Sequence, residues 1–312
     1  MKIVLKSAAK SNEGTLRKTV PLYAILKRKG RKKMAYDIRI EKDILYREGG
    51  KPYGADSQTL DLYLPIRAGN CPILVFFHGG GFLHYYWTKE NYVEYCTELA
   101  KEGIAVAAPN YRLYPEFAGF PQAPDPAFCD DPDGIFRGFL DDSACAMAWV
   151  RDHLADYVPY NGRMFLGGHS AGAWLSMMIL FDESVLAPYG MQPSQLAGCI
   201  FASGQPTSHF SVLFARGRDP RLTLIDDAAP MYYLKSLPVP QLVTLAETDL
   251  TNRDLQTQLY LASLKTIGYE GSVQFIEYRG HTHDNYVCPD ADAPEIPVAL
   301  HADTVAFIRK YG

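Results

Sequence analysis

A serine between two glycines is the most chemically suggestive feature of this sequence. Ser170 stands at the centre of the pattern Gly-His-Ser-Ala-Gly at 168–172, after the apolar run 164–166 and before the apolar stretch 173–181. A buried strand followed by a helix is the context in which a Gly-x-Ser-x-Gly turn lifts a serine hydroxyl above the end of a sheet. The glycines have a steric role, because a side chain two positions from the apex would collide with the neighbouring strand or helix. The alternative for this motif alone is a glycine-rich turn without chemistry.

A serine hydroxyl is a poor nucleophile at neutral pH, so Ser170 needs a general base within hydrogen-bond reach and an acid that orients the base. In an α/β architecture both groups should follow later strands at the carboxyl edge of the sheet. Asp249 follows the strand predicted at 241–246, and His283 follows the last predicted strand, at 273–278. The chain order Ser, Asp, His is the order that goes with this Gly-x-Ser-x-Gly turn. We therefore predict that Ser170, Asp249 and His283 are the catalytic residues.

Other residues near these positions are alternatives. Glu247 and Asp254 are rival acids, although either could be a surface charge or a residue at a helix start. His281 is the alternative base. Two histidines and a carboxylate, at His281, His283 and Asp284, could also form a metal cluster, but they lack distant partners at ligand spacing. We therefore predict no metal and no cofactor.

A second glycine-rich segment follows a predicted central strand. Three consecutive glycines at 79–81 come after the continuous apolar run 73–77. Backbone N–H groups that no side chain shields are what an oxyanion hole needs. A flexible glycine loop is the alternative.

Strands and helices alternate along the chain that must position these residues. Period-two patterns at 36–40 and 59–64 predict half-exposed antiparallel strands, and residues from 110 to about 139 predict an irregular surface excursion. Further strands are predicted at 73–77, 104–108, 164–166, 197–202, 241–246 and 273–278, with helices at 92–101, 141–154, 173–181, 255–267 and 298–310. This alternation predicts an α/β fold with one mostly parallel, doubly wound sheet and lid or cap segments.

Composition limits the class of protein. No apolar run approaches the ~20 residues that span a bilayer, and the apolar start before Lys6 is too short for a signal peptide. The six cysteines are scattered without a C-x-x-C pair, which favours reduced thiols over disulfides. We expect a soluble, cytoplasmic protein.

The N-terminal segment is unusually basic. Up to Lys33 the chain has eleven lysines and arginines but only one acidic residue, Glu13, and its apolar residues recur at roughly helical spacing. A nucleic-acid or membrane contact is one interpretation, particularly around residues 27–33, but no aromatic residue is interleaved in that basic run to stack on bases, so we favour a solvated arm or helix. We assign residues 1–35 to a helical basic lead-in that could form part of a cap, and residues 36–312 to the catalytic domain. The expected partners are a small-molecule ester and a possible second copy of the chain, with no nucleic acid and no stable membrane insertion.

Four features of the chain occur together: His-Gly-Gly-Gly-Phe at 78–82, Tyr-Arg-Leu-x-Pro-Glu at 111–116, Gly-His-Ser-Ala-Gly at 168–172, and Asp249 before a terminal histidine. In combination they resemble the α/β-hydrolase superfamily, in its hormone-sensitive-lipase-like serine carboxylesterase branch. The resemblance covers roughly residue 60 to the C-terminus. It implies an oxyanion hole made by the N–H groups of Gly80, Gly81 and Ala171, and hydrolysis of short- to medium-chain acyl or aryl esters.

Two departures from this branch affect the substrate. His169 precedes the nucleophile where the branch more often has aspartate, and extra residues run from about 123 to 138. The motif around Ser170 is also similar to that of aryl formamidases of kynurenine metabolism and of some feruloyl esterases. The alternatives are therefore a formamidase and, on the same fold, a non-catalytic ligand receptor.

Aromatic residues are predicted to bound an apolar acyl pocket. Tyr86 and Trp87 follow the glycine loop, and Phe210 and Phe214 lie in the long crossover between the strands at 197–202 and 241–246. Such a crossover is typical of a lid or specificity loop. The alternative is that Phe210 and Phe214 only anchor the crossover to the core.

Overall fold

A sheet of nine strands, in the order β1-β9-β8-β7-β6-β4-β5-β3-β2, runs through the part of the chain that the structure describes. The structure is a computed structural model, and it describes residues 17–20, 35–47, 58–83, 87–114, 131–289 and 298–312. The strands are β1 Arg17–Val20, β2 Ile38–Leu45, β3 Thr59–Pro65, β4 Cys71–Phe77, β5 Ala105–Pro109, β6 Tyr160–His169, β7 Gly198–Ala202, β8 Gln241–Thr248 and β9 Val273–Thr282. All neighbours are parallel except β3, which is antiparallel to both β5 and β2.

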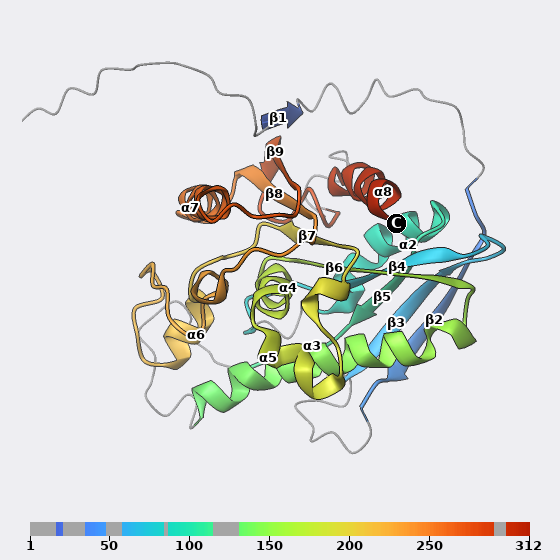
Figure 1. Ribbon diagram of the computed structural model, residues 1–312, viewed down its shortest axis with the longest axis horizontal. Helices are drawn as coiled ribbons and strands as arrows, with labels where there is room; N and C mark the ends of the chain where they lie inside the picture. The colour runs from blue at the N-terminus through green and yellow to red at the C-terminus, as the bar shows by residue number, and fades with distance from the viewer. Residues whose placement is uncertain (1–16, 21–34, 48–57, 84–86, 115–130, 290–297) are drawn as a thin grey trace, which may run out of the picture.

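Helices cover both faces of the sheet (Figure 1). The α-helices are α2 Val93–Lys101, α3 Pro132–His153, α4 Ala171–Phe181, α5 Glu183–Leu186, α6 Phe210–Ala215, α7 Arg253–Thr266 and α8 Leu300–Tyr311, and short 3₁₀ turns include η1 Lys89–Tyr92. Alternate residues of β4 enter different cores: Val75 and Phe77 join the core with α3 and α4, whereas Phe76 joins the core with α2 and α8. The fold is the mostly parallel, doubly wound α/β sheet that the sequence predicts.

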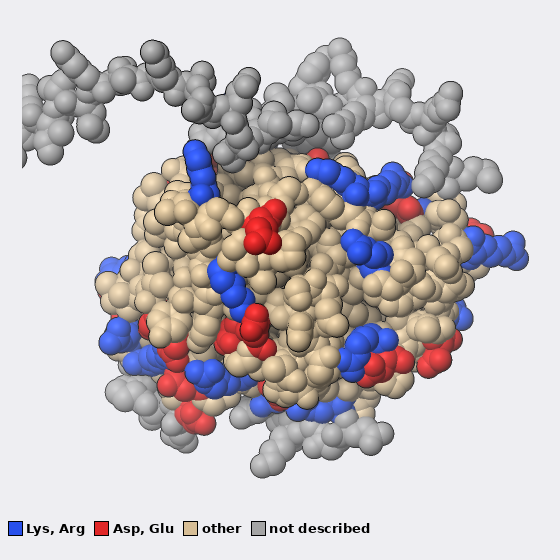
Figure 2. Space-filling model, viewed as in Figure 1, with Lys and Arg blue, Asp and Glu red and all other residues tan. Residues whose placement is uncertain are grey.

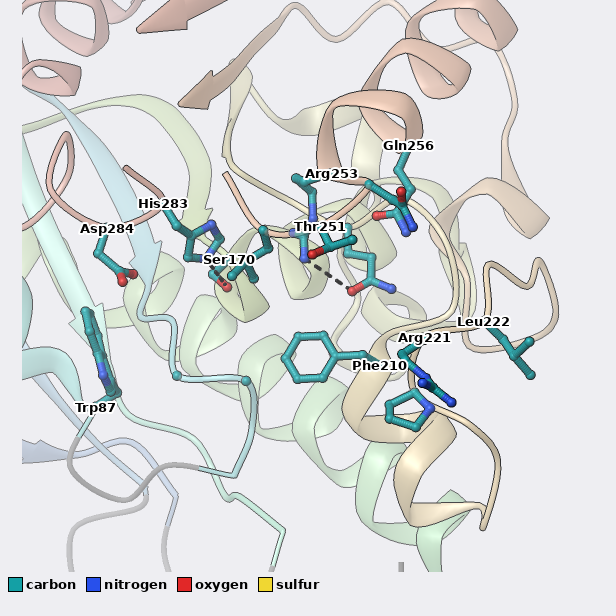
Figure 3. A pocket seen from close by; sticks show the side chains of 16 residues that line it. Trp87, Ser170, Phe210, Arg221, Leu222, Thr251, Arg253, Gln256, His283 and Asp284 are labelled. Carbon is teal, nitrogen blue, oxygen red and sulfur yellow. Dashed lines mark hydrogen bonds between the residues drawn. The ribbon is translucent and has the colours of Figure 1, made fainter. Parts of the chain in front are cut away.

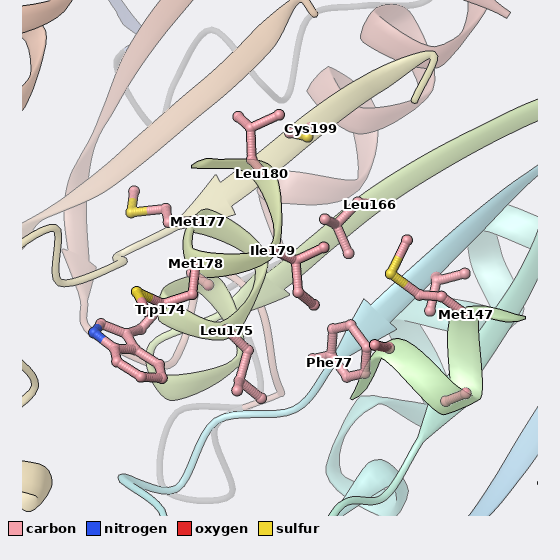
Figure 4. Close-up of a cluster of buried hydrophobic side chains, with 14 of the residues drawn as sticks. Phe77, Met147, Leu166, Trp174, Leu175, Met177, Met178, Ile179, Leu180 and Cys199 are labelled. Atoms are coloured by element: carbon pink, nitrogen blue, oxygen red, sulfur yellow. The ribbon is translucent and has the colours of Figure 1, made fainter. Parts of the chain in front are cut away.

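Helix α4 lies at the centre of one core. All eleven of its residues are buried, as expected for a helix that is apolar on every side (Figure 4). Trp174 fills the space beneath the crossover and donates from its indole nitrogen to the carbonyl of Ala228, 3.1 Å away. The helix that follows the nucleophile is therefore fixed on all sides.

Helix α3 begins earlier than predicted, at Pro132 rather than near residue 141. The prolines and aspartates there suggested an irregular excursion. Pro132 instead occupies the first helical turn, where its missing N–H costs nothing, and Asp131 caps the helix by accepting from the N–H of Gly134 at 2.8 Å. Residues 115–130 lie outside the described residues.

Strand β3 is buried along its whole length, although its pattern predicted a half-exposed strand. It is internal because β5 pairs with one edge and β2 with the other. Its polar residue Asp61 is fully buried and accepts from the ammonium of Lys89 at 2.5 Å. Asp61 can be buried because the charge of Lys89 neutralises it, so a polar residue in this strand does not indicate an exposed face.

The N-terminal lead-in contributes a strand where a helix was predicted. Arg17–Val20 forms β1 and pairs in parallel with β9. The outer edge of β9 offers unpaired backbone groups, and the β-branched residues Thr19 and Val20 favour a strand. Residues 1–16 and 21–34 lie outside the described residues, so the division into lead-in and catalytic domain stays a prediction.

Figure 2 shows basic and acidic side chains interspersed over the viewed face. Within the described ranges, no helix combines the length and apolar character required to cross a membrane.

Candidate active site

The turn between β6 and α4 holds Ser170 in a strained conformation. Its φ is 53° and its ψ is −115°, a backbone shape that a non-glycine residue rarely adopts, and its N–H donates to the carbonyl of Ala202 at 2.8 Å. A Cβ on Gly172 would lie 2.1 Å from the carbonyl oxygen of Phe77, and one on Gly168 would lie 2.3 Å from the carbonyl carbon of Gly172. Both glycines are therefore sterically required, as the sequence predicts.

The structure brings Ser170, His283 and Asp249 together from the ends of three strands. Nε2 of His283 lies 2.9 Å from the Ser170 hydroxyl, and Nδ1 lies 2.6 Å from Oδ1 of Asp249. With Nδ1–H donating to the carboxylate, Nε2 is free to accept the serine proton. The three side chains have the geometry of a nucleophile, a general base and an orienting acid.

Asp249 is held by several donors. Ser203 donates its hydroxyl to Oδ2, Tyr286 donates to the Ser203 hydroxyl at 2.8 Å, and the N–H of Leu250 donates to Oδ1 at 2.7 Å. Burial raises the pKa of Asp249, but hydrogen bonding to His283 and the charges of His283 and Arg253 outweigh it and hold the pKa at about 2. The carboxylate is ionised at neutral pH. Sequence reasoning did not identify Ser203 or Tyr286, and no local motif marks them.

The structure places the rival residues elsewhere. Glu247 is exposed and accepts from the N–H of Gly280 at 2.8 Å, and Asp254 is exposed on the first turn of α7. His281 is buried with its Nδ1 3.1 Å from Asn285 Oδ1, and no contact with Ser170 is seen among the described residues. None of the three occupies the position of the acid or base.

Gly80 and Gly81 line the same pocket as Ser170, and Ala171 follows Ser170 in the chain. Gly80 and Gly81 adopt positive φ angles of 102° and 63°, and Ala171 begins α4. Among the described residues, the N–H groups of Gly80, Gly81 and Ala171 have no acceptor. Three free donors beside a nucleophile can bind a negatively charged oxygen. The geometry therefore suits the oxyanion hole that the resemblance implies.

Two aromatic side chains brace the glycine loop. The ring of His78 stacks on Tyr111 with the centroids 4.2 Å apart, and the Tyr111 hydroxyl donates to the carbonyl of His78 at 2.7 Å. His78 Nδ1 donates to the carbonyl of Gly79 at 2.8 Å. Burial lowers the pKa of His78 to about 4, so its ring is neutral at pH 7. The Tyr-Arg-Leu motif thus fixes the loop through Tyr111.

His169, the departure from the family pattern, connects three parts of the site. The N–H of Gly79 donates to the Tyr92 hydroxyl at 2.8 Å, which donates to Nδ1 of His169 at 2.8 Å. Nε2 of His169 then donates to the carbonyl of His283 at 2.9 Å. Burial, and then repulsion by His283, lowers the pKa of His169 to about 3. A neutral histidine therefore connects the glycine loop to the loop that carries His283.

A pocket of about 860 Å³ opens at the nucleophile (Figure 3). Trp87 lines one end and Phe210 lies on the other side of Ser170, so these two predicted residues reach the pocket. Phe214 does not line it; its side chain is fully buried and anchors the crossover to the core. Its assignment to the substrate site is corrected accordingly, because α6 turns it inward. Tyr86 lies outside the described residues.

The potential metal ligands near the base are already engaged. Ligand atoms of His169, His283 and Asp284 lie within 4.8 Å of one another, whereas His281 is not part of this group. Both nitrogens of His283 and both nitrogens of His169 are used in the hydrogen bonds described above. The donor set therefore suits proton transfer better than coordination.

Comparison with known proteins places this geometry in a family. The BD-FAE family model matches residues 60–187. Tuliposide A-converting enzyme 2, chloroplastic, from Tulipa gesneriana is 35% identical over 278 residues, which cover 82% of this chain and 68% of that protein. The probable N-octanoylanthranilate hydrolase AqdA2 of Rhodococcus erythropolis is 32% identical over 166 residues, 51% of this chain and 34% of that protein.

Solved structures share the fold. Esterase B of Lactobacillus rhamnosis superposes with a TM-score of 0.63 at 19% identity, covering 89% of this chain and 88% of the esterase. Esterase 2 of Thermogutta terrifontis gives a TM-score of 0.62 at 18% identity, covering 90% of this chain and 96% of the esterase. Fold, motifs and sequence identity agree: the chain belongs to the hormone-sensitive-lipase-like esterases of the α/β-hydrolase superfamily.

Proposed function

We propose that the protein is a serine carboxylesterase that hydrolyses short- to medium-chain acyl or aryl esters through an acyl-enzyme on Ser170. The observation that carries the proposal is the hydrogen-bonded series Ser170, His283 and Asp249, with distances of 2.9 and 2.6 Å, at the strained end of β6. Its chemistry uses only groups of this chain. A cytoplasmic location belongs to the same proposal.

In the first half-reaction, the Ser170 oxygen attacks the ester carbonyl while Nε2 of His283 takes its proton. Asp249 stabilises the imidazolium that forms. The oxygen of the tetrahedral intermediate accepts hydrogen bonds from the N–H groups of Gly80, Gly81 and Ala171. Collapse of the intermediate breaks the bond to the alcohol, which leaves with the proton from His283.

In the second half-reaction, water replaces the alcohol. His283 removes a proton from the water as it attacks the acyl-enzyme, and the same N–H groups stabilise the second tetrahedral intermediate. The acid is released when Ser170 leaves and recovers its proton. The large side chains of Trp87 and Phe210 at the pocket support a preference for acyl groups of limited length.

The proposal is tested with p-nitrophenyl esters of two to sixteen carbons, aryl esters and an N-aryl formamide. We expect kcat to fall by about 10⁴-fold or more in Ser170→Ala. A fluorophosphonate probe should label the wild type and not this variant. Near-normal turnover by Ser170→Ala would disprove the serine mechanism, whereas a preference for the formamide would replace the esterase with the formamidase.

A further inference from the structure

Arg253 is a deeply buried cation beside the pocket. Its side chain lines the pocket, yet the residue is only 2% exposed. One terminal nitrogen donates to the carbonyl of Ser203 and the other donates to Oε1 of Gln205 at 3.3 Å, whereas Nε has no acceptor. No carboxylate in the described part of the chain lies within 4.0 Å of this guanidinium. Arg253 thus has neutral acceptors only.

Other cations of this protein are compensated where they are buried. Lys89, also 2% exposed, contacts Asp61 at 2.5 Å and Asp43 at 2.6 Å. Arg112 and Arg216 are less deeply buried, and each contacts a carboxylate at 2.7 Å. A buried charge without a partner is costly, so the contrast requires an explanation.

Asp249 is the nearest candidate for a counter-charge, but its oxygens are occupied. His283 and Leu250 donate to Oδ1, and Ser203 donates to Oδ2. Asp249 and Arg253 attract each other through space, but the carboxylate and the guanidinium are not in direct contact. The guanidinium therefore lies at the pocket wall without a carboxylate bound to it.

The side chains around Arg253 are also polar. Gln205 and Gln256 line the same part of the pocket and are 3% and 8% exposed, and Oε1 of Gln256 has no donor. Rotation of the Gln256 amide by 180° would present its N–H group in place of that oxygen. Figure 3 shows Gln256, Arg253 and Thr251 together on one side of Ser170, with Trp87 on the other side. An alkyl chain against this wall would leave the polar groups unsatisfied.

We propose that Gln205, Arg253 and Gln256 form a subsite for a carboxylate carried by the substrate, while the ester of the same molecule reacts at Ser170. This inference rests on the proposed esterase function and names its substrate class. A guanidinium with no carboxylate in contact can bind one, and planar amide and guanidinium donors match the two oxygens of a carboxylate. The natural substrate is then an ester with a free acid group, and the pocket is not uniformly apolar as the sequence suggested.

The test compares esters that differ only in this charge. Charge on the alcohol side is probed by 4-acetoxybenzoate and 4-acetoxybenzamide, and charge on the acyl side by p-nitrophenyl hydrogen adipate and the p-nitrophenyl ester of adipic acid monoamide. Each kcat/KM is normalised by the rate of hydrolysis in hydroxide. In one of the two pairs we expect the wild type to favour the carboxylate by about tenfold or more. A ratio near one, or a preference for the amide, in both pairs would overturn the subsite.

Variants assign the preference to Arg253. In Arg253→Gln the ratio of carboxylate to amide should fall to about one, and Arg253→Lys should retain part of it. Arg221→Gln is the matched control, because Arg221 also lines the pocket but is exposed and paired with Asp219. A wild-type ratio in Arg253→Gln, or the same loss in Arg221→Gln, would contradict the proposal. Should Arg253→Gln fail to fold, Gln256→Leu is expected to lower the ratio and is read in the same way.

The ratio also separates this inference from the proposed function. If the neutral esters are hydrolysed in a Ser170-dependent manner without a charge preference, only the subsite is wrong. If no member of either pair is hydrolysed through Ser170, the esterase proposal itself fails.

Discussion

The two sides of the pocket are held in different ways. On the catalytic side, Ser170, Asp249 and His283 each follow the end of a strand, so the sheet sets their positions. The opposite side includes the crossover between β7 and β8, residues 203–240, which is held by side-chain bonds such as that from Ser208 to Asp226 at 2.6 Å. The difference indicates that the sheet fixes the proposed catalytic residues, while bonds within the crossover, including the backbone bond from Ser208 N–H to the carbonyl of Leu224 at 2.9 Å, fix the shape of the opposite side.

The largest effect should come from the catalytic side. His283→Ala is expected to reduce kcat by about 10³-fold or more, because Ser170 loses its base, with little change in the free energy of unfolding. His281→Ala should keep most of the activity, since His281 contacts Asn285 instead. Rates with p-nitrophenyl acetate and urea unfolding of both variants check this. An inactive His281→Ala beside an active His283→Ala would reverse the assignment of the base.

In the crossover, we expect one substitution to change the stability of the fold and another to change the acyl-chain preference. Phe214→Ala should lower the free energy of unfolding by about 3–5 kcal/mol, because it empties a fully buried position. Its optimal acyl length should not change. Phe210→Ala should move that optimum upward by about two carbons, because Phe210 lines the pocket. The p-nitrophenyl series and urea unfolding measure both effects, and a shifted optimum in Phe214→Ala would return this residue to the pocket.

Buried histidines beneath the catalytic side should make stability depend on pH. The pKa of His169 is lowered to about 3, so below pH 6.5 the unfolded chain binds a proton that the folded protein does not. The contribution of neutral, buried His169 to the free energy of unfolding is therefore complete above pH 6.5 and is lost as the pH falls towards 3. Between pH 7 and pH 5 the free energy of unfolding should fall by about 2 kcal/mol through His169 alone.

Urea unfolding at pH 7 and pH 5 measures this loss in the wild type and in His169→Gln. Between pH 7 and pH 5, the free energy of unfolding should fall by about 2 kcal/mol less in the variant than in the wild type, because glutamine does not titrate. An equal pH dependence in both proteins would show that His169 is protonated in the folded state.

The smallest effect concerns the bond that joins the two sides. The hydroxyl of Ser211, on α6, donates to the carbonyl of Gly81 and so holds the glycine loop against the crossover. Ser211→Ala should reduce kcat by about tenfold with KM nearly unchanged, because the N–H of Gly81 acts on charge that appears only in the tetrahedral intermediate. Ser208→Ala, which breaks a bond within the crossover, is the control. A change confined to KM would mean that Ser211 shapes the binding surface only.

The sequence predicted the proximity of Ser170, Asp249 and His283 because its signals there are local. The apolar run before Ser170 and the apolar helix after it identify the turn, and the two glycines follow from sterics. Asp249 and His283 could be selected because each lies just past a recognisable strand. Strand ends in a parallel sheet meet at one edge, so these positions predict proximity without further information.

Long-range packing explains what the sequence did not reveal. Arg253 stands beside the exposed Asp254, and nothing in that stretch indicates that one side chain is buried and the other is not. Ser203 and Tyr286 meet Asp249 only through the folded sheet. Helix α3 was predicted too short because a proline in this stretch indicates a helix break. Proline breaks a helix in the middle, but it is favoured in the first turn, where Pro132 lies.

The pairing of β1 with β9 has a consequence for how the chain folds. Arg17 lies opposite Phe275 in this parallel pair, so the partner of β1 is synthesised long after it. On the ribosome β1 waits unpaired until β9 has been made. Because the other strands are then already assembled, the pairing of β1 closes only the short connection between β1 and β2. Pairing of β1 is then a late event of folding, and until it occurs the edge of β9 is exposed to pairing with other chains.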